Sequence, residues 1–196
     1  MKPRIAGLMM SATLGCGVAT TAHTVAKAQF FRSPDSEASP LQRLFGFSSS
    51  PVQPSLVSFP ASYRPGTIVI STSGRRLYFV NAPGQAISYG IGVGRLGFTW
   101  TGTHTVSMKR EWPDWTPPSE MLHRRPDLPR HMVGGLENPL GARAIYLGSS
   151  LYRIHGSNEP ETIGQAVSSG CYRMTNEDVI DLYNRVRVGA KVVVLR

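Results

Sequence analysis

Cysteine is scarce in this chain: its 196 residues include two, Cys16 and Cys171. We expect Cys171 alone to remain free in the mature protein, because Cys16 lies in an N-terminal export signal. A lone thiol excludes an intramolecular disulfide. Paired metal ligands are also missing, since His104, His123 and His131 are dispersed without the spacing of a ligand pair. The sequence therefore predicts neither a metal site nor a cofactor.

Acidic residues are few as well, with 12 Asp and Glu against 21 Lys and Arg and a formal net charge of +9. A basic balance suits a polyanionic or carboxylate-bearing partner. Nucleic acid is not expected, because the arginines are scattered and no module of interleaved aromatic and basic residues is present. Cell-wall polymer or an anionic membrane surface fits an exported protein better, unless the charge serves solubility alone.

The absence of a long hydrophobic run argues against a membrane anchor. Residues 1–28 combine a basic start, a mostly apolar stretch and an A-x-A cleavage site at 26–28, as a secretory signal does. The apolar stretch is interrupted by polar residues and glycines and is shorter than the roughly 20 residues of a spanning helix. We therefore predict a cleaved signal peptide over 1–28 and a periplasmic location. The alternative is a lipoprotein acylated at Cys16, a signal that Thr13-Leu14-Gly15-Cys16 matches only in part.

Two segments follow the signal. Residues 29–64 hold nine serines and five prolines but few apolar side chains, a composition that cannot bury enough surface to offset the entropy of ordering. We interpret this stretch as a flexible, Ser/Pro-rich tether. From residue 65 short apolar runs alternate with turn signals, which predicts one folded domain over 65–196 that is mainly β with short helices.

The strands expected in this domain are 67–70, 76–80, 87–93, 103–109, 143–147, 151–154 and 191–195. Two helices are expected, one over 159–166 and one that starts at Thr175 and turns an apolar stripe toward the core. Residues 111–141 contain Trp112, Trp115 and several prolines, so they cannot form a central strand. A loop of this length predicts a lid or groove wall, in which the tryptophans either line a groove or pin the loop to the core.

The residues that carry chemistry lie in two segments, His155-Gly156-Ser157-Asn158 and Ser168-Ser169-Gly170-Cys171-Tyr172-Arg173-Met174. A thiol attacks a carbonyl as the thiolate, and a nearby histidine is the usual means of forming it near neutral pH. The glycines of both segments let the backbone approach a substrate closely. Backbone N–H groups from Gly170 to Cys171 could face a developing oxyanion. The pattern predicts a cysteine acyl-transfer enzyme and leaves open whether water or an amine accepts the acyl group.

These two segments, with Ile163-Gly164 between them, resemble the catalytic signature of the L,D-transpeptidases, the YkuD-type enzymes that cross-link peptidoglycan. The similarity covers about residues 66–196. Two positions differ from the family pattern: many members carry histidine at the position of Ser169 and an aliphatic residue where Tyr172 stands. The resemblance implies an L,D-transpeptidase-type β-sandwich in which a helix-loop carries the nucleophile.

The resemblance also implies roles, with Cys171 as the nucleophile and His155 as the general base and acid. Two supporting sets are implied: an oxyanion loop of Ser168, Ser169 and Gly170, and substrate contacts from Gly156, Tyr172 and Arg173. Arg173 could instead form a salt bridge within the domain. In the implied reaction Cys171 forms a thioester with a peptidoglycan tetrapeptide stem, D-alanine leaves, and the acyl group passes to an amine in a 3→3 cross-link.

Several alternatives stay open at this point. The same site could act as an L,D-carboxypeptidase or attach a wall or outer-membrane protein as acceptor. A sortase-like thiol transpeptidase or peptidase is a second class, because sortases also order histidine, cysteine and arginine along the chain. A non-catalytic wall-binding module is a third, although binding alone needs no thiolate. The resemblance further implies acylation by carbapenems, which react with many members of the family.

Overall fold

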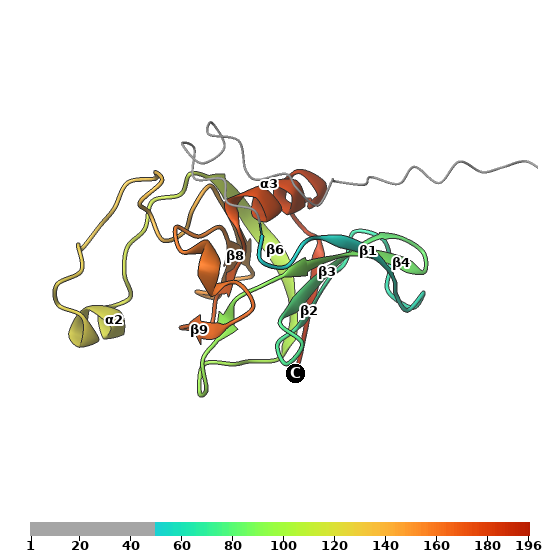
Figure 1. Ribbon diagram of the computed structural model, residues 1–196, viewed down its shortest axis with the longest axis horizontal. Coiled ribbons are helices and arrows are strands. Elements are labelled where there is room, and N and C mark those ends of the chain that lie inside the picture. Colours follow the sequence, from blue (N-terminus) through green and yellow to red (C-terminus); the bar gives the residue numbers. More distant parts are fainter. Residues whose placement is uncertain (1–49) are drawn as a thin grey trace, which may run out of the picture. The chain divides into compact units, whose positions relative to one another are not determined.

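The computed structural model describes residues 50–196 of the chain, whose elements carry the labels of Figure 1. The signal peptide predicted over 1–28, the modification considered at Cys16 and most of the tether over 29–64 lie outside the described residues. Within the described part, no helix has the length and apolar character needed to cross a membrane.

Strands dominate the described residues, as the sequence predicts. They are β1 (Ser55–Ser58), β2 (Ile68–Ser71), β3 (Arg76–Ala82), β4 (Gln85–Gly90), β5 (Val93–Gly94), β6 (Gly102–Glu111), β7 (Arg143–Leu147), β8 (Arg153–His155), β9 (Ala166–Ser168), β10 (Tyr172–Arg173) and β11 (Lys191–Leu195). The helical elements are α2 (Ser119–Arg124), the 3-10 turn η1 (Pro160–Thr162) and α3 (Asn176–Arg185).

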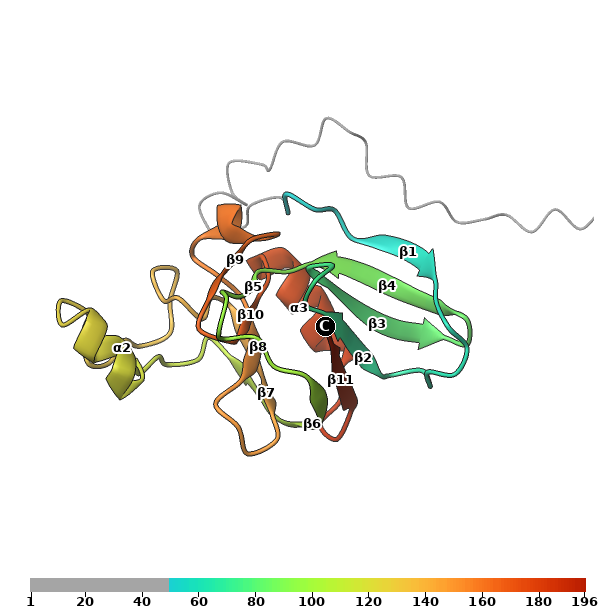
Figure 2. The same cartoon turned by 90° about the horizontal axis from the view of Figure 1, so that it is seen from below.

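Nine of these strands form one sheet in the order β1-β4-β3-β2-β11-β6-β7-β8-β10, while β5 pairs with β9 in a separate parallel ribbon. Figure 2 shows β1, β4, β3, β2 and β11 side by side, with α3 near the β2 end of this row, where it contacts β7. Within the large sheet, β11 with β2 and β8 with β10 are parallel, and the other neighbours are antiparallel.

The long strand β6 turns the corner between two parts of the sheet. Its residues 102–105 pair with β11, whereas 106–111 pair with β7, and the register shifts between Val106 and Met108. Strands that change sheets at a bulge form the corners of packed two-layer β structures. Buried side chains from both parts, such as Leu77 and Ile154, meet in one core with α3. The sandwich-type, mainly β prediction is confirmed.

Helix α3 forms where the sequence predicts the second helix. Thr175 is its N-cap, and its hydroxyl accepts a hydrogen bond from the Asp178 N–H at 3.2 Å. Val179 and Leu182 are fully buried on its inner face. At the other end the Lys109 ammonium donates to two of the last carbonyls, which also suits the negative end of the helix dipole.

The prediction of a helix over 159–166 is wrong. Only the turn η1 is helical there, Ile163 is extended, and Gly164 has a φ of +86°, which ends any right-handed helix. The chain then continues into β9, whose pairing with β5 satisfies backbone groups that a helix would otherwise use. Cys171 therefore lies in a loop between two strands rather than in a helix-loop.

The tether prediction also fails for its last part, residues 50–64. Ser55 to Ser58 form β1 and pair with β4 at the edge of the large sheet. Beyond β1, the Phe59 ring lies 5.0 Å from the Tyr78 ring, centroid to centroid. Pairing to a distant strand and one aromatic anchor order this segment, and neither contribution is visible in its composition.

The segment 111–141 folds around its own polar anchor. The Asn138 side-chain amide donates to the carbonyl oxygens of Pro113 and Val133, which ties the start of the segment to its end. Trp115 is buried and bridges to Met132, so this tryptophan pins the loop, one of the two alternatives. In both views α2 lies apart from the sheets (Figures 1 and 2).

Replacing Thr175 by alanine should lower the free energy of unfolding by about 1 kcal/mol, because the Asp178 N–H loses its acceptor. Thr175→Ser keeps the hydroxyl and should retain most of that stability. Urea unfolding followed by circular dichroism measures the difference. Thr101→Ala, at an exposed position before β6, is the matched control and should stay within about 0.5 kcal/mol of the wild type. Equal losses in Thr175→Ala and Thr101→Ala would contradict the capping role.

Candidate active site

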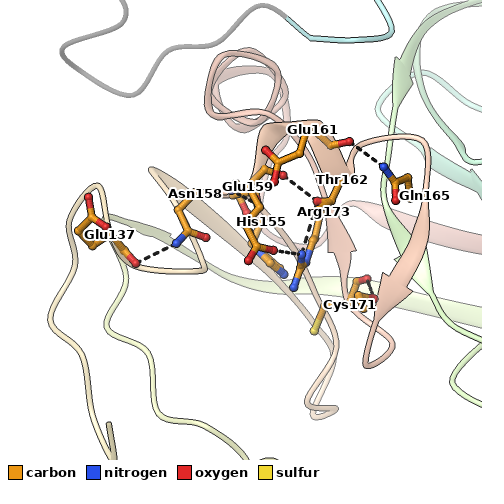
Figure 3. A network of polar contacts seen from close by, with 12 residues as sticks. Glu137, His155, Asn158, Glu159, Glu161, Thr162, Gln165, Cys171 and Arg173 are labelled. Atoms are coloured by element: carbon orange, nitrogen blue, oxygen red, sulfur yellow. Dashed lines mark hydrogen bonds and ion pairs between the residues drawn. The ribbon is translucent and has the colours of Figure 1, made fainter. Parts of the chain in front are cut away.

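The parallel pairing of β8 with β10 places the candidate catalytic residues. Ile154 lies opposite Tyr172, and His155 lies opposite Arg173. Because side chains alternate along a strand, Ile154 and Tyr172 enter the core while His155 and Arg173 share the other face. Figure 3 shows these two residues gathered with Cys171, which immediately precedes β10.

His155 is buried and held by the backbone. Its Nδ1 lies 2.6 Å from the Gly156 carbonyl oxygen. A carbonyl only accepts, so Nδ1 carries the proton and Nε2 is left as the basic nitrogen. Burial, together with smaller contributions from the positive charges of Arg173 and Arg153, lowers the pKa of His155 to about 3, although the hydrogen bond to Gly156 acts in the opposite direction. The imidazole is therefore neutral over the ordinary pH range, as a general base must be.

Cys171 rests as a protonated thiol. Its Sγ donates to the Leu151 carbonyl oxygen at 3.7 Å, and among residues 50–196 no hydrogen bond joins this sulfur to His155. Burial raises the pKa of the Cys171 thiol, while a hydrogen bond from the Arg153 backbone and the charges of Arg153 and Arg173 lower it. The thiol must leave Leu151 before its proton can pass to the imidazole.

The loop before Cys171 is shaped by the Ser168 hydroxyl. This hydroxyl donates to the Cys171 carbonyl at 2.6 Å and accepts from the Gly170 N–H at 3.2 Å. Gly170 has a φ of +109°, and a Cβ there would lie 2.7 Å from the Tyr152 ring, so both conformation and space require glycine. The Gly170 N–H is thus engaged, which leaves the Cys171 N–H as the predicted oxyanion donor of this loop. Ser169, which lies between Ser168 and Gly170, is half-buried and uncharged.

Two aromatic residues that the sequence does not single out hold this loop from outside. The Trp100 indole N–H donates to the Gly170 carbonyl at 3.1 Å, and the ring stacks on Tyr152 with centroids 4.5 Å apart. Trp100 precedes β6 and Tyr152 precedes β8, so their meeting is a result of the tertiary fold. Trp100 and Tyr152 therefore hold the loop before Cys171 through one hydrogen bond and one stacked ring pair.

Two predicted substrate contacts, Tyr172 and Gly156, have other positions in the structure. Tyr172 is 1% exposed and lies in the core, so its side chain does not face the site. Gly156 is buried, and a Cβ there would overlap Asn176 Oδ1 and approach the Ala142 nitrogen at 3.0 Å. Both assignments of direct contact are corrected by the alternation of β8 and β10 and by close packing. Gly156 acts on the site through the carbonyl that holds His155.

Arg173 forms the salt bridge that the sequence left as its alternative role. Its guanidinium lies 2.7 Å from a Glu159 carboxylate oxygen and 3.4 Å from the Thr162 hydroxyl. Figure 3 draws both contacts as dashed lines. The pair fixes the loop after β8 to β10. A substrate carboxylate would have to share or replace Glu159 to reach this arginine.

The segment 111–141 reaches the site at two points. The Asn158 side-chain amide donates to the Glu137 carbonyl at 3.1 Å. On the other side, Arg124 of α2 lies 6.0 Å from the centroid of the Phe98 ring, over which Arg95 stacks at 4.5 Å. This segment therefore borders both chain stretches that flank the candidate catalytic residues. Among the described residues no cluster of three or more metal-ligating side chains occurs.

Arg153 is the charged residue that sequence reasoning missed. It lies in the predicted strand 151–154, where a basic residue reads as a solvated position. The only available signal was its place two residues before His155, which puts both side chains on the same face of a strand. The β8–β10 register, which brings that face to Cys171, could not be read from the sequence.

The fold and the site define a mainly β domain with a thiol and an imidazole beside a parallel strand pair. Residues 65–194 match the family model described as the L,D-transpeptidase catalytic domain, YkuD. The "Probable L,D-transpeptidase ErfK/SrfK" of Escherichia coli K12 is 36% identical over 151 residues, which are 72% of this chain and 47% of that protein. The chain belongs to the L,D-transpeptidase family, and it spans about half the length of the curated relatives it matches.

Solved structures agree with this fold. L,D-transpeptidase 3 from Mycobacterium tuberculosis, in complex with a faropenem-derived adduct, is 21% identical, with a TM-score of 0.54 over 66% of this chain and 60% of that one. A crystal structure described as a probable carnitine operon oxidoreductase from Brucella melitensis is 48% identical, with a TM-score of 0.50 over 73% of this chain and 93% of that one. That description names a different chemistry; the family model and the curated relatives decide the family.

The buried histidine should make stability depend on pH. In the unfolded chain its pKa is about 6.5, so between about 3 and 6.5 the unfolded state binds the proton and acidification favours unfolding. Wild type should lose stability relative to His155→Gln as the pH falls from 6.5 to 4.5, by at most about 1.4 kcal/mol per pH unit. The Asp178 carboxyl, whose pKa burial raises to about 6, acts in the opposite sense, but it is common to both proteins.

Urea unfolding of both proteins at four pH values between 4.5 and 7.5 measures this difference. His123→Gln, which removes an exposed histidine of α2, is the control and should follow the wild type. A gap between wild type and His155→Gln that stays constant over this range would show that the folded imidazole titrates normally.

Proposed function

We propose that this protein is an L,D-transpeptidase that uses Cys171 as nucleophile and His155 as general base and acid on peptidoglycan stem peptides. The observation that supports it most is the placement of both residues on one face of the β8–β10 pair, inside the region that matches the family. The proposal includes export by a cleaved signal peptide and action in the periplasm.

The reaction begins when the thiol leaves the Leu151 carbonyl and gives its proton to Nε2 of His155. The thiolate attacks the carbonyl of the third residue of a tetrapeptide stem, and the Cys171 N–H stabilises the oxyanion. His155 then protonates the departing D-alanine nitrogen, which leaves a thioester on Cys171. An amine of a second stem attacks the thioester, gives its proton to His155, and forms the 3→3 cross-link while the thiol is restored.

The buried, carbonyl-bound state of His155 supports this sequence of proton transfers. A neutral imidazole with a fixed Nδ1–H presents a single basic nitrogen to each reacting group. The position of the segment 111–141, which borders both Asn158 and the loop of Phe98, supports a role as the wall of a substrate groove. Acceptor choice distinguishes cross-linking from carboxypeptidase action and from attachment of a protein to the wall.

The purified protein should convert tetrapeptide-bearing muropeptides into a 3→3 dimer with loss of D-alanine. Cys171→Ala should form no product, and His155→Gln should be slower by about 100-fold or more, the usual contribution of a general base. Cys16→Ser, made in the full chain with the predicted signal peptide retained, removes the other cysteine and is the control that should keep full activity. Mass spectrometry identifies each product.

Two results of this experiment would change the assignment. Release of D-alanine without a dimer points to the carboxypeptidase, because water then resolves the thioester. If no product forms and Cys171 gains no mass from faropenem, the adduct-forming compound of the Mycobacterium tuberculosis neighbour, the enzymatic proposal fails.

A further inference from the structure

We propose that Arg153 is a positioning residue whose guanidinium and backbone N–H favour the deprotonated form of Cys171 and keep His155 neutral beside it. This inference rests on the proposed function, because it assigns a role within the same site. It adds one charged side chain to the pair of thiol and imidazole that the sequence identifies.

The strand register brings Arg153 to the nucleophile. Arg153 lies opposite Tyr146 on the antiparallel partner β7. On the other side, Ile154 pairs with Tyr172, so the register places the preceding residues, Arg153 and Cys171, level with each other. Residues that face each other across neighbouring strands project their side chains to the same side, with Cβ atoms roughly 5 Å apart. The side chains of Tyr146, Arg153 and Cys171 thus lie in one line across the three neighbouring chain segments. His155, two residues after Arg153 on β8, projects to the same face.

The side chain of Arg153 is held but incompletely satisfied. Its guanidinium carbon lies 5.2 Å from the centroid of the Tyr146 ring, which fixes the group in place. Its Nε is buried and has no hydrogen-bond partner among the described residues. A buried donor without an acceptor costs stability, so an anion formed within its reach would offer it a partner.

Arg153 also carries a charge that is not neutralised locally. Among the ion pairs of residues 50–196 none includes Arg153, whereas Arg173, the other arginine of this face, is paired with Glu159. Ser169, next to the nucleophile, is neutral. The unpaired positive charge near Cys171 therefore comes from Arg153.

The electrostatic effects on the two reacting groups have the same origin. Burial raises the pKa of the Cys171 thiol, and the backbone hydrogen bond and charge of Arg153 oppose that rise. Burial, with a smaller contribution from the same charge, lowers the pKa of His155, so the imidazole stays neutral. The Arg153 guanidinium thus favours the thiolate form of Cys171 and disfavours the protonated form of His155.

Alkylation of Cys171 tests this inference without any peptidoglycan substrate. The full chain is treated with iodoacetamide from pH 5 to 10, and the modified Cys171 peptide is quantified by mass spectrometry, which separates it from Cys16. Arg153→Met keeps the stem over Tyr146 but removes the charge, and its rate profile should move up by about one pH unit, so that alkylation at pH 7 is about tenfold slower. Arg153→Lys keeps the charge and should recover most of the rate.

Arg143→Met is the matched control. Arg143 also stacks on a tyrosine, Tyr183, and also has a buried Nε without a partner, but it points to the opposite face of the sheet. Its profile should coincide with that of the wild type. Circular dichroism confirms that each variant is folded before its profile is compared.

The proposal is overturned if the profile of Arg153→Met coincides with that of the wild type, or if Arg143→Met shifts equally. It is also overturned if Arg153→Lys behaves as Arg153→Met does. The proposed function fails separately: a shifted profile in a protein that forms no cross-link, hydrolysis product or faropenem adduct would leave Arg153 in its role and remove the transpeptidase assignment.

Discussion

The site depends on the two-residue parallel pairing of β8 with β10. This short ladder places His155 beside Arg173 and brings Cys171 level with the preceding residue of β8. The pairing is fixed by its other face, where Ile154 and Tyr172 are fully buried. Because the side-chain period of a strand is two, a slip of one residue would turn Tyr172 outward and Cys171 inward. The hydrophobic core thus fixes the register on which the reacting groups depend.

Burial has opposite consequences for the two reacting groups. It keeps His155 neutral and so able to accept a proton, but it also keeps the Cys171 thiol protonated. Positive charge in such a site favours the thiolate of Cys171, although it also lowers the basicity of His155. The two arginines on the same face supply this charge, and the pairing of Arg173 with Glu159 leaves them with unequal effective charge.

Local sequence patterns predict the parts of this structure that local physics decides. The strands β2, β3, β7 and β11 and the helix α3 follow from apolar periodicity and from the cap at Thr175, and His155 does end a strand. The missing parts are all long-range. Pairing with β4 orders β1, pairing with β5 turns the end of the predicted helix 159–166 into β9, and the contact of Trp100 with Gly170 spans 70 residues. The role of Arg153 belongs to this group, since the register that brings it to Cys171 is a property of the folded sheet.

The ion pair between Arg173 and Glu159 lies where the proposed substrate would meet the resting site. Glu159 is half-exposed, and ion pairs of this kind contribute only about 0–1 kcal/mol, so the pair can be exchanged at little cost. A stem peptide carries carboxylates that can make the same contact with Arg173. Displacement of Glu159 would release the loop after β8, whose Asn158 also holds the segment 111–141 through Glu137. If a substrate carboxylate binds Arg173 as proposed, that binding is coupled through one short loop to the position of the segment 111–141, and the salt bridge holds this loop until the competing carboxylate arrives.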